Sequence, residues 1–210
     1  MQSLASTIAA MVKLSYKEQV QRMREDAIVE AVNRLLAAKG YDAMTVDEVA
    51  AEAGIAKASV YKHFASREDL AAGARVRALD RAMTFVDALR EDTKAQPFEQ
   101  LKAVAGWAIS SQLANEMPLL PSQNSSLTNS LQAHEAYMDR LISLSNKLSI
   151  WITEAQTSGQ LNPALPAEMV LYILFARACD PVVGMLKTSD MYTNNQIYAW
   201  VPRTTLDVLR

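Results

Sequence analysis

Residues 40–70 read GYDAMTVDEVAAEAGIAKASVYKHFASREDL, and this stretch contains two short helical patterns separated by a glycine turn. The first pattern begins at Thr45, and Glu48 three residues later completes the spacing of a helix-opening capping box. The buried face predicted for this helix consists of Val46, Val49, Ala50 and Ala53. Gly54 ends the helix because glycine readily adopts turn conformations that other residues avoid.

The second short helix is predicted over residues 56–63, and we expect the ring of Phe64 to be buried against the helix that precedes both. Ser66 and Asp69 repeat the capping signature and begin a long helix over residues 66–92. Two short helices that are joined by a tight glycine turn and braced by another helix form a helix-turn-helix. The sequence therefore predicts a compact three-helix unit, and a long helix extends from it.

The bracing helix is predicted over residues 17–39, and Gly40 ends it. Its expected apolar face consists of Val20, Met23, Ala27, Ala31, Leu35 and Ala38. Residues 1–15 lack the basic start and continuous apolar centre of a signal peptide, so we interpret them as an N-terminal extension.

Four further helices are expected at residues 98–115, 127–157, 166–187 and 194–209, after a break at Pro97. The second of them carries one buried stripe, which comprises Leu131, His134, Met138, Leu141, Leu148 and Ile152. The third is apolar nearly all round, so we expect it to be buried, with a kink at Pro181.

The composition agrees with an all-α protein, because half of the 210 residues are hydrophobic and only six are Gly and seven Pro. The single cysteine, Cys179, excludes an internal disulfide framework, and no Cys/His cluster has metal-ligand spacing. The longest apolar run, residues 169–176, is too short to cross a bilayer, so we expect a cytoplasmic protein without a membrane partner. No nucleophile elbow, phosphate loop or zinc signature is present, so we expect no catalytic residue, metal or cofactor.

The segments at residues 40–50, 53–64 and 66–70 resemble the DNA-binding signature of the TetR family almost position for position. The resemblance covers residues 24–70 and implies a helix-turn-helix DNA-binding domain at residues 16–70. It further implies an effector-binding and dimerisation domain at residues 71–210, with the helix at 66–92 shared by both. The last two long helices would then form a four-helix interface in a homodimer.

The resemblance also implies which side chains contact a palindromic double-stranded operator. Lys57, Ala58 and Ser59 would lie toward base edges, and Tyr61, Lys62 and His63 would face phosphates. Thr45 and Arg67 would add further phosphate contacts. The net charge of −2 requires that DNA affinity come from such a local surface. Ala56 departs from the usual Ser or Thr, and the missing helix cap costs about 1 kcal/mol.

The remaining helices supply aromatic and methionine side chains of the kind that line apolar ligand cavities. The expected effector-binding residues are Phe85, Trp107, Ser111, Met138, Trp151 and Arg177. Alternatively, these aromatics and methionines only fill the core, His134 is a satisfied core imidazole, and Arg177 pairs with Asp180.

We expect a repressor that a small, largely apolar effector releases from its operator, and not an enzyme. One alternative is a constitutive helix-turn-helix factor that has no effector, for which a promoter-binding assay would show no effector-dependent release. Another is a helical-bundle enzyme with an unrecognised cofactor, for which a bound cofactor or turnover would be found.

Overall fold

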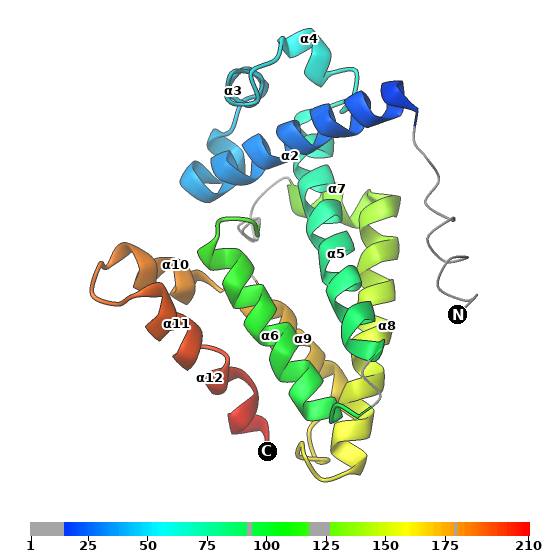
Figure 1. Ribbon diagram of the computed structural model, residues 1–210, viewed down its shortest axis with the longest axis vertical. Helices are drawn as coiled ribbons and strands as arrows, with labels where there is room; N and C mark the ends of the chain where they lie inside the picture. The colour runs from blue at the N-terminus through cyan, green and yellow to red at the C-terminus, as the bar shows by residue number, and fades with distance from the viewer. Residues whose placement is uncertain (1–14, 92–93, 118–126, 179) are drawn as a thin grey trace, which may run out of the picture.

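The computed structural model describes residues 15–91, 94–117, 127–178 and 180–210, and within these residues the fold is helical throughout, without strands. Helix α2 (Tyr16–Ala43) crosses one end of α5 (Arg67–Glu91), and α3 (Val46–Glu52) and α4 (Lys57–Val60) lie beyond it (Figure 1). The other helices form a bundle around the rest of α5. The all-α fold class predicted from the sequence is confirmed.

Helix α2 begins at Ser15, which forms a capping box with Glu18, and its regular geometry is interrupted at Gly40, where φ is 76°. Its buried face differs from the predicted one, since Met23 is 71% exposed. The residues that reach the core are Ile28, Val29, Ala31, Val32 and Leu36. The buried positions therefore lie between Ile28 and Leu36, where larger Ile, Val and Leu side chains join Ala31 in the core.

Helix α4 is shorter than expected, because it ends at Val60. The chain continues as a turn in which Lys62 N–H donates to Ser59 O at 3.2 Å and His63 N–H donates to Val60 O at 3.0 Å. The ring of Phe64 then packs on α5, over Gly73, as well as in the core that α2 contributes to. The expectation that this ring is buried against the first helix holds in part, because the ring is half-buried and also packs on α5.

Helix α5 contributes to two apolar cores. Leu70, Ala71, Ala72 and Ala74 are buried with α2, α3 and α4 in the first core. Ala82 and Val86 are buried in the second core, with α6 (Pro97–Leu113), α8 (Glu135–Thr157) and α9 (Ala167–Ala178). One continuous helix thus connects the helix-turn-helix to the bundle.

The predicted helix over 127–157 is in fact two helices, α7 (Leu127–Ala133) and α8, which are separated at His134. His134 is not a core imidazole on a continuous stripe. It has extended backbone geometry and caps α8, accepting a hydrogen bond from the Tyr137 N–H at Nδ1. Leu127 and Leu131 of α7 are buried in the first core. The break therefore allows α7 to pack against the helix-turn-helix.

The predicted helices over 166–187 and 194–209 are also divided. Helix α9 is followed by α10 (Pro181–Thr188), which Asp180 caps, so Pro181 begins a new helix and does not kink one. Near Pro202, which has no N–H to donate, α11 (Asn194–Trp200) gives way to α12 (Arg203–Leu206) and a 3₁₀ turn, Asp207–Leu209.

Apolar side chains on α9 and α10 remain exposed in the single chain, so packing within one chain does not bury this segment all round. They include Met169, Tyr172, Val182 and Met185, of which Met185 is 69% exposed. By length and composition alone, Ala167–Thr188 is apolar enough to cross a membrane. It also runs through residue 179, outside the described residues, and is divided by the cap at Asp180. The core helix of a soluble protein passes the same test, so this segment is weak evidence for a membrane span.

Gly73 lies where a larger residue would collide with Phe64, because an added Cβ would lie 2.5 Å from the Phe64 Cε1. Alanine usually stabilises a helix by about 1 kcal/mol relative to glycine. Overpacking typically costs about 1 to 3 kcal/mol, so we expect Gly73→Ala to lower the free energy of unfolding. Urea denaturation measures this change. In the double variant Phe64→Leu/Gly73→Ala the loss should be smaller than the sum of the two single losses, and strict additivity would contradict the proposed clash.

Candidate DNA-binding surface and effector cavity

Hydrogen bonds at both ends of α3 fix the turn that positions α4. Glu48 N–H donates to the Thr45 hydroxyl oxygen at 3.3 Å, and Thr45 N–H donates to the Glu48 carboxylate at 3.0 Å. After α3, Gly54 has a φ of 68°, a conformation that glycine adopts without strain. Ile55 N–H then donates to Ala50 O at 3.0 Å. The direction of α4 therefore follows from local sequence, although Ala56 makes no side-chain cap.

Six of the eight predicted DNA-contact residues lie on α4 and the turn after it, and four of the six are exposed. Ala58 and Lys62 face solvent, Tyr61 is 48% exposed, and Ser59 is half-buried. Together with Lys57 they form an outward face large enough to meet DNA.

Lys57 forms an ion pair with Asp47 of α3, with 2.9 Å between Nζ and Oδ2. The hydrogen bond from this ammonium to the Asp47 carboxylate, and then the attraction between the two charges, raise the pKa of Lys57 above its ordinary value. The cation is therefore retained at neutral pH, and the pair orients Lys57 along the outer face of α3 and α4.

Thr45, His63 and Arg67, which are also predicted to contact DNA, are held by contacts within the protein. The Thr45 hydroxyl participates in the capping box. The side chain of His63 is only 9% exposed, and its Nδ1 lies 3.2 Å from the Glu25 carboxylate. The Arg67 guanidinium lies 4.4 Å from the centre of the Tyr41 ring. Their contact with DNA remains a prediction.

The sequence analysis missed a hollow between the start of α2 and the turn after α4. Lys17 and Arg24 of α2 line it together with Lys62 and His63. Lys17 and Arg24 are seven residues apart, which places them on one side of a helix, and this spacing was visible in the sequence. The cationic surface therefore extends from α4 onto α2.

An apolar cavity of about 410 Å³ lies among α5, α6, α8 and α9, within the size range of small-molecule sites. Its lining comprises Arg75, Ala78, Leu79, Ala82, Val104, Ala105, Trp107, Ala108, Met117, Tyr137, Leu141, Leu144, Leu148, Tyr172, Leu174, Phe175, Ala176 and Ala178. The cavity lies between α5 and α8, where an effector was expected.

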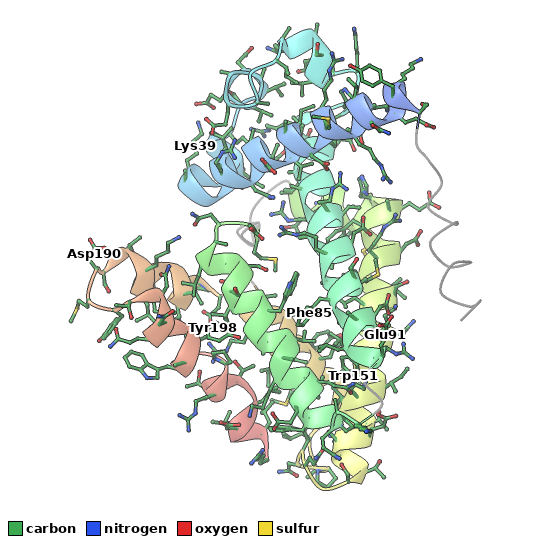
Figure 2. The ribbon with its side chains drawn as sticks, in the orientation of Figure 1. Lys39, Phe85, Glu91, Trp151, Asp190 and Tyr198 are labelled. Carbon is green, nitrogen blue, oxygen red and sulfur yellow. The ribbon has the colours of Figure 1, made fainter. Side chains whose placement is uncertain are left out.

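Of the six predicted effector-binding residues, Trp107 alone is among the residues that line this cavity. Phe85 of α5, which Figure 2 labels, stacks against Trp107, with ring centres 5.7 Å apart and an angle of 19° between the ring planes. Trp151 is buried in the second core and Arg177 pairs with Asp180. Ser111 is buried elsewhere in α6, and Met138 is half-buried outside the lining. The structure thus does not bring the six residues together. The helix breaks at His134 and Asp180 change which helix faces point into the cavity.

Arg75 and Tyr137 are lining residues that the sequence analysis missed. Arg75 lies four and three residues from Ala71 and Ala78, on an alanine-rich face of α5. A charged residue on such a face is unusual, and this signal was available in the sequence.

His134 and Tyr137 connect the cavity wall to the start of α5. Tyr137 lines the cavity and also packs against the first core. The Nε2 atom of His134 lies 3.4 Å from the Asp69 Oδ1, and the other oxygen of that carboxylate accepts a hydrogen bond from Ala65 N–H at 2.8 Å. A displacement of α8 is thereby linked to the segment that follows α4.

These features define a helix-turn-helix protein whose recognition unit is joined to a cavity-containing helical bundle. Residues 28–74 match the family model of bacterial regulatory proteins of the tetR family. The HTH-type transcriptional regulator AlkX of Mycobacterium tuberculosis is 32% identical over 88 residues, which span 42% of this chain and 42% of that protein. The helix-turn-helix segment is thus similar to that of TetR-family transcriptional regulators, and the chain spans less than half of the length of the curated relatives that it matches.

Two solved structures share the fold over nearly the whole chain. FadR of Bacillus subtilis, in complex with stearoyl-CoA, has a TM-score of 0.63 and 22% identity, covering 88% of this chain and 98% of that one. AibR, in complex with isovaleryl coenzyme A and operator DNA, has a TM-score of 0.63 and 20% identity, covering 87% and 98%. These similarities establish the architecture of the bundle as well as that of the helix-turn-helix.

Glu48 generates a prediction about acid stability. Its hydrogen bonds with Lys39 and then with Thr45 lower its pKa from 4.5 to about 2. A depressed pKa in the folded state contributes stability above pH 4.5, and this contribution is lost as the pH falls toward 2. We expect Glu48→Gln to be less stable than the parent at neutral pH, with the difference shrinking over that interval.

Denaturation at a series of pH values measures this difference, and Glu154→Gln on α8 controls for the loss of an exposed carboxylate. A difference between the parent and Glu48→Gln that does not change with pH would show that the carboxylate is not responsible.

Proposed function

We propose that this chain is a repressor that binds a palindromic operator as a homodimer and is released by a small, largely apolar effector. The observation that carries the proposal is the participation of α5 in both the core of the helix-turn-helix and the wall of the cavity. A ligand that changes the packing around Ala78 and Ala82 acts on the helix whose first turns hold the recognition unit. We assign DNA binding to residues 16–70 and effector binding and dimerisation to 71–210, with α5 shared.

The length of α5 supports this mechanism. A helix of 25 residues is about 38 Å long at 1.5 Å per residue, so a tilt of a few degrees moves its end by several Å. Two recognition helices on one face of DNA must lie about 34 Å apart, one helical turn. An effector that binds more tightly to a dimer with a different spacing lowers the operator affinity. The size of this decrease is set by the difference between the effector's affinities for the two spacings.

The exposed face of α4 supports direct DNA contact. We expect Lys57→Ala and Tyr61→Ala each to weaken specific operator binding about tenfold, within the 1 to 3 kcal/mol typical of direct contacts. Lys62→Ala should instead weaken binding to all sequences and reduce the salt dependence, because phosphate contacts release counterions. Gel shifts with a palindrome selected from random DNA measure both effects. Lys102→Ala on α6 is the control, and unchanged binding of the first two variants would place the recognition surface elsewhere.

The apolar lining of the cavity supports an apolar effector. FadR and AibR, which share the fold, were solved with stearoyl-CoA and isovaleryl coenzyme A, ligands that carry hydrocarbon chains. A cavity lined almost entirely by hydrocarbon selects such groups by excluding water. The alternative of a constitutive factor assigns no role to this cavity.

Trp107 and Trp151 form a matched pair for testing the cavity, because the first lines it and the second is buried in the core. We expect Trp107→Ala to raise the effector concentration needed for operator release while leaving effector-free DNA affinity within about twofold. Trp151→Ala should instead lower the free energy of unfolding by about 3 to 5 kcal/mol, as for other buried aromatics. Thermal unfolding and effector-dependent gel shifts distinguish these outcomes. An unaltered response of a folded Trp107→Ala would exclude this cavity as the effector site.

The exposed apolar side chains of α9 and α10 support a homodimer. Met169, Val182 and Met185 are large apolar side chains exposed on these two consecutive helices, and exposed apolar side chains that gather on one surface are typical of an interface between copies. Leu174, by contrast, is only 5% exposed and lines the cavity, so a charge there tests the core and not the interface. The dimer is therefore best tested at the exposed positions.

We expect Met185→Glu to give monomers that bind the operator weakly, because the new carboxylate would be buried without a partner in the dimer. Ile142→Glu is the matched control, since Ile142 is an apolar residue of α8 that is 52% exposed. Light scattering after gel filtration reports the oligomeric state. A dimeric Met185→Glu with normal operator affinity would move the interface away from α10.

A further inference from the structure

The apolar cavity among α5, α6, α8 and α9 has one exposed stretch of wall. Of the described residues that line it, Tyr172 and Ala176 are exposed, and the others are buried or half-buried. Tyr172 is 67% exposed although it lines the cavity. The two residues are four apart on α9 and therefore lie one turn apart on one face of that helix. The cavity thus reaches solvent at the outer face of α9.

This opening leaves an apolar ligand incompletely enclosed. From Tyr172 the wall continues inward through Phe175, which is half-buried, and Leu174, which is buried. Small-molecule sites commonly bury about 70 to 90% of the ligand surface. Apolar surface that stays in water at the opening gains nothing from the hydrophobic effect. A cover of apolar character over Tyr172 and Ala176 would therefore strengthen the binding of an apolar ligand.

The outer face of α9 is suited to contact with an identical face. Met169, Tyr172 and Ala176 share this face by their helical spacing, and Met169 is 49% exposed. Residues 169–176 carry no charge, so two copies of the face can meet without opposing like charges. Most homodimers are built in this way, with the same surface of each subunit in contact.

The charged residues of α9 lie at its two ends. Glu168 is in the first turn, and Arg177 in the last turn forms an ion pair with Asp180. The next helix, α10, also exposes the apolar side chains of Val182 and Met185. The uncharged part of α9 is therefore followed along the chain by further apolar side chains that a second subunit can cover.

We propose that the partner subunit of the homodimer closes the effector cavity, with a second copy of α9 lying across Tyr172 and Ala176. This inference rests on the proposed function, in which the cavity binds the effector and α9 and α10 form the dimer interface. Each bound effector is then enclosed by both subunits. Effector binding and dimerisation consequently strengthen each other by the same factor, because coupling between two binding events is reciprocal.

The first test compares the release of an apolar fluorophore, 1-aminoanthracene, from dimers and monomers of the full chain. Met169→Glu should give monomers, because its carboxylate would be buried without a partner in the dimer, and Met169 is not among the lining residues. We expect stopped-flow release from Met169→Glu to be faster by about tenfold or more, within the usual range of coupling between binding events. Ile142→Glu, at an exposed position of α8, should release the fluorophore at the parent rate.

A cavity-filling variant separates fluorophore in the cavity from fluorophore on exposed apolar surface. Ala78 lines the cavity, and the larger side chain of Ala78→Leu occupies part of its volume. The signal that Ala78→Leu removes in the parent and in Met169→Glu is the signal of the cavity. Only the release rate of this signal enters the comparison.

The second test measures the reciprocal effect on dimerisation. Met169→Ala shortens the side chain without adding a charge, and it should weaken the dimer enough for sedimentation to measure its dissociation constant. We expect saturating 1-aminoanthracene to lower this constant by about tenfold or more. This measurement does not use Met169→Glu, so a misfolded Met169→Glu does not remove the test.

Equal release rates from the parent and a monomeric Met169→Glu, or a dissociation constant that the fluorophore does not change, would overturn closure by the partner and leave the cavity as the effector site. A dimeric Met169→Glu would overturn it by placing the outer face of α9 outside the interface. If the parent does not bind the fluorophore and Trp107→Ala also leaves the effector response unchanged, the proposed function of the cavity itself fails.

Discussion

The packing of α5 into two cores is the interaction on which the rest of the structure depends. Its first turns bury Leu70 and Ala74 against the helix-turn-helix, and its later turns bury Ala82 and Val86 against α6 and α8. Small alanine side chains permit close approach of neighbouring helices on both sides. Because one helix cannot rotate at one end and stay fixed at the other, the orientation of the recognition unit is tied to the packing of the bundle.

A second connection runs through α7 and the start of α8. Leu127 and Leu131 pack in the core of the helix-turn-helix, and His134 joins the start of α8 to Asp69. Tyr137 belongs to the same segment and also lines the cavity. The bundle therefore holds the recognition unit at two places, α5 and α7, and a ligand between α5 and α8 lies between these two attachments. Under the proposed function, the spacing of α5 and α8 is the variable that a ligand would change.

Cationic side chains and exposed apolar side chains are found on different parts of the molecule. Cationic side chains at Lys57, Lys62 and Arg24 lie on α4 and α2, although the chain as a whole has a net charge of −2. Met169 of α9 and Met185 of α10 are exposed in the other part of the chain, although Met23 of α2 is exposed as well. A dimer formed through the second surface leaves the first free to contact DNA, and two copies of the first are then held at a fixed distance.

The sequence by itself determined the helix-turn-helix, because the signals are local: the capping pair Thr45 and Glu48, the turn at Gly54 and the missing cap at Ala56 each act within a few residues. It also carries the resemblance to TetR-family regulators, since the family model matches residues 28–74. Only the tertiary structure decided which face of α2 is buried, where His134 divides a helix, and that Trp107 lines the cavity while Trp151 does not. These outcomes depend on contacts between helices far apart in the chain, and helical periodicity alone leaves several faces with nearly equal apolar content. The cavity is such an outcome, because its wall forms only where α5, α6, α8 and α9 meet.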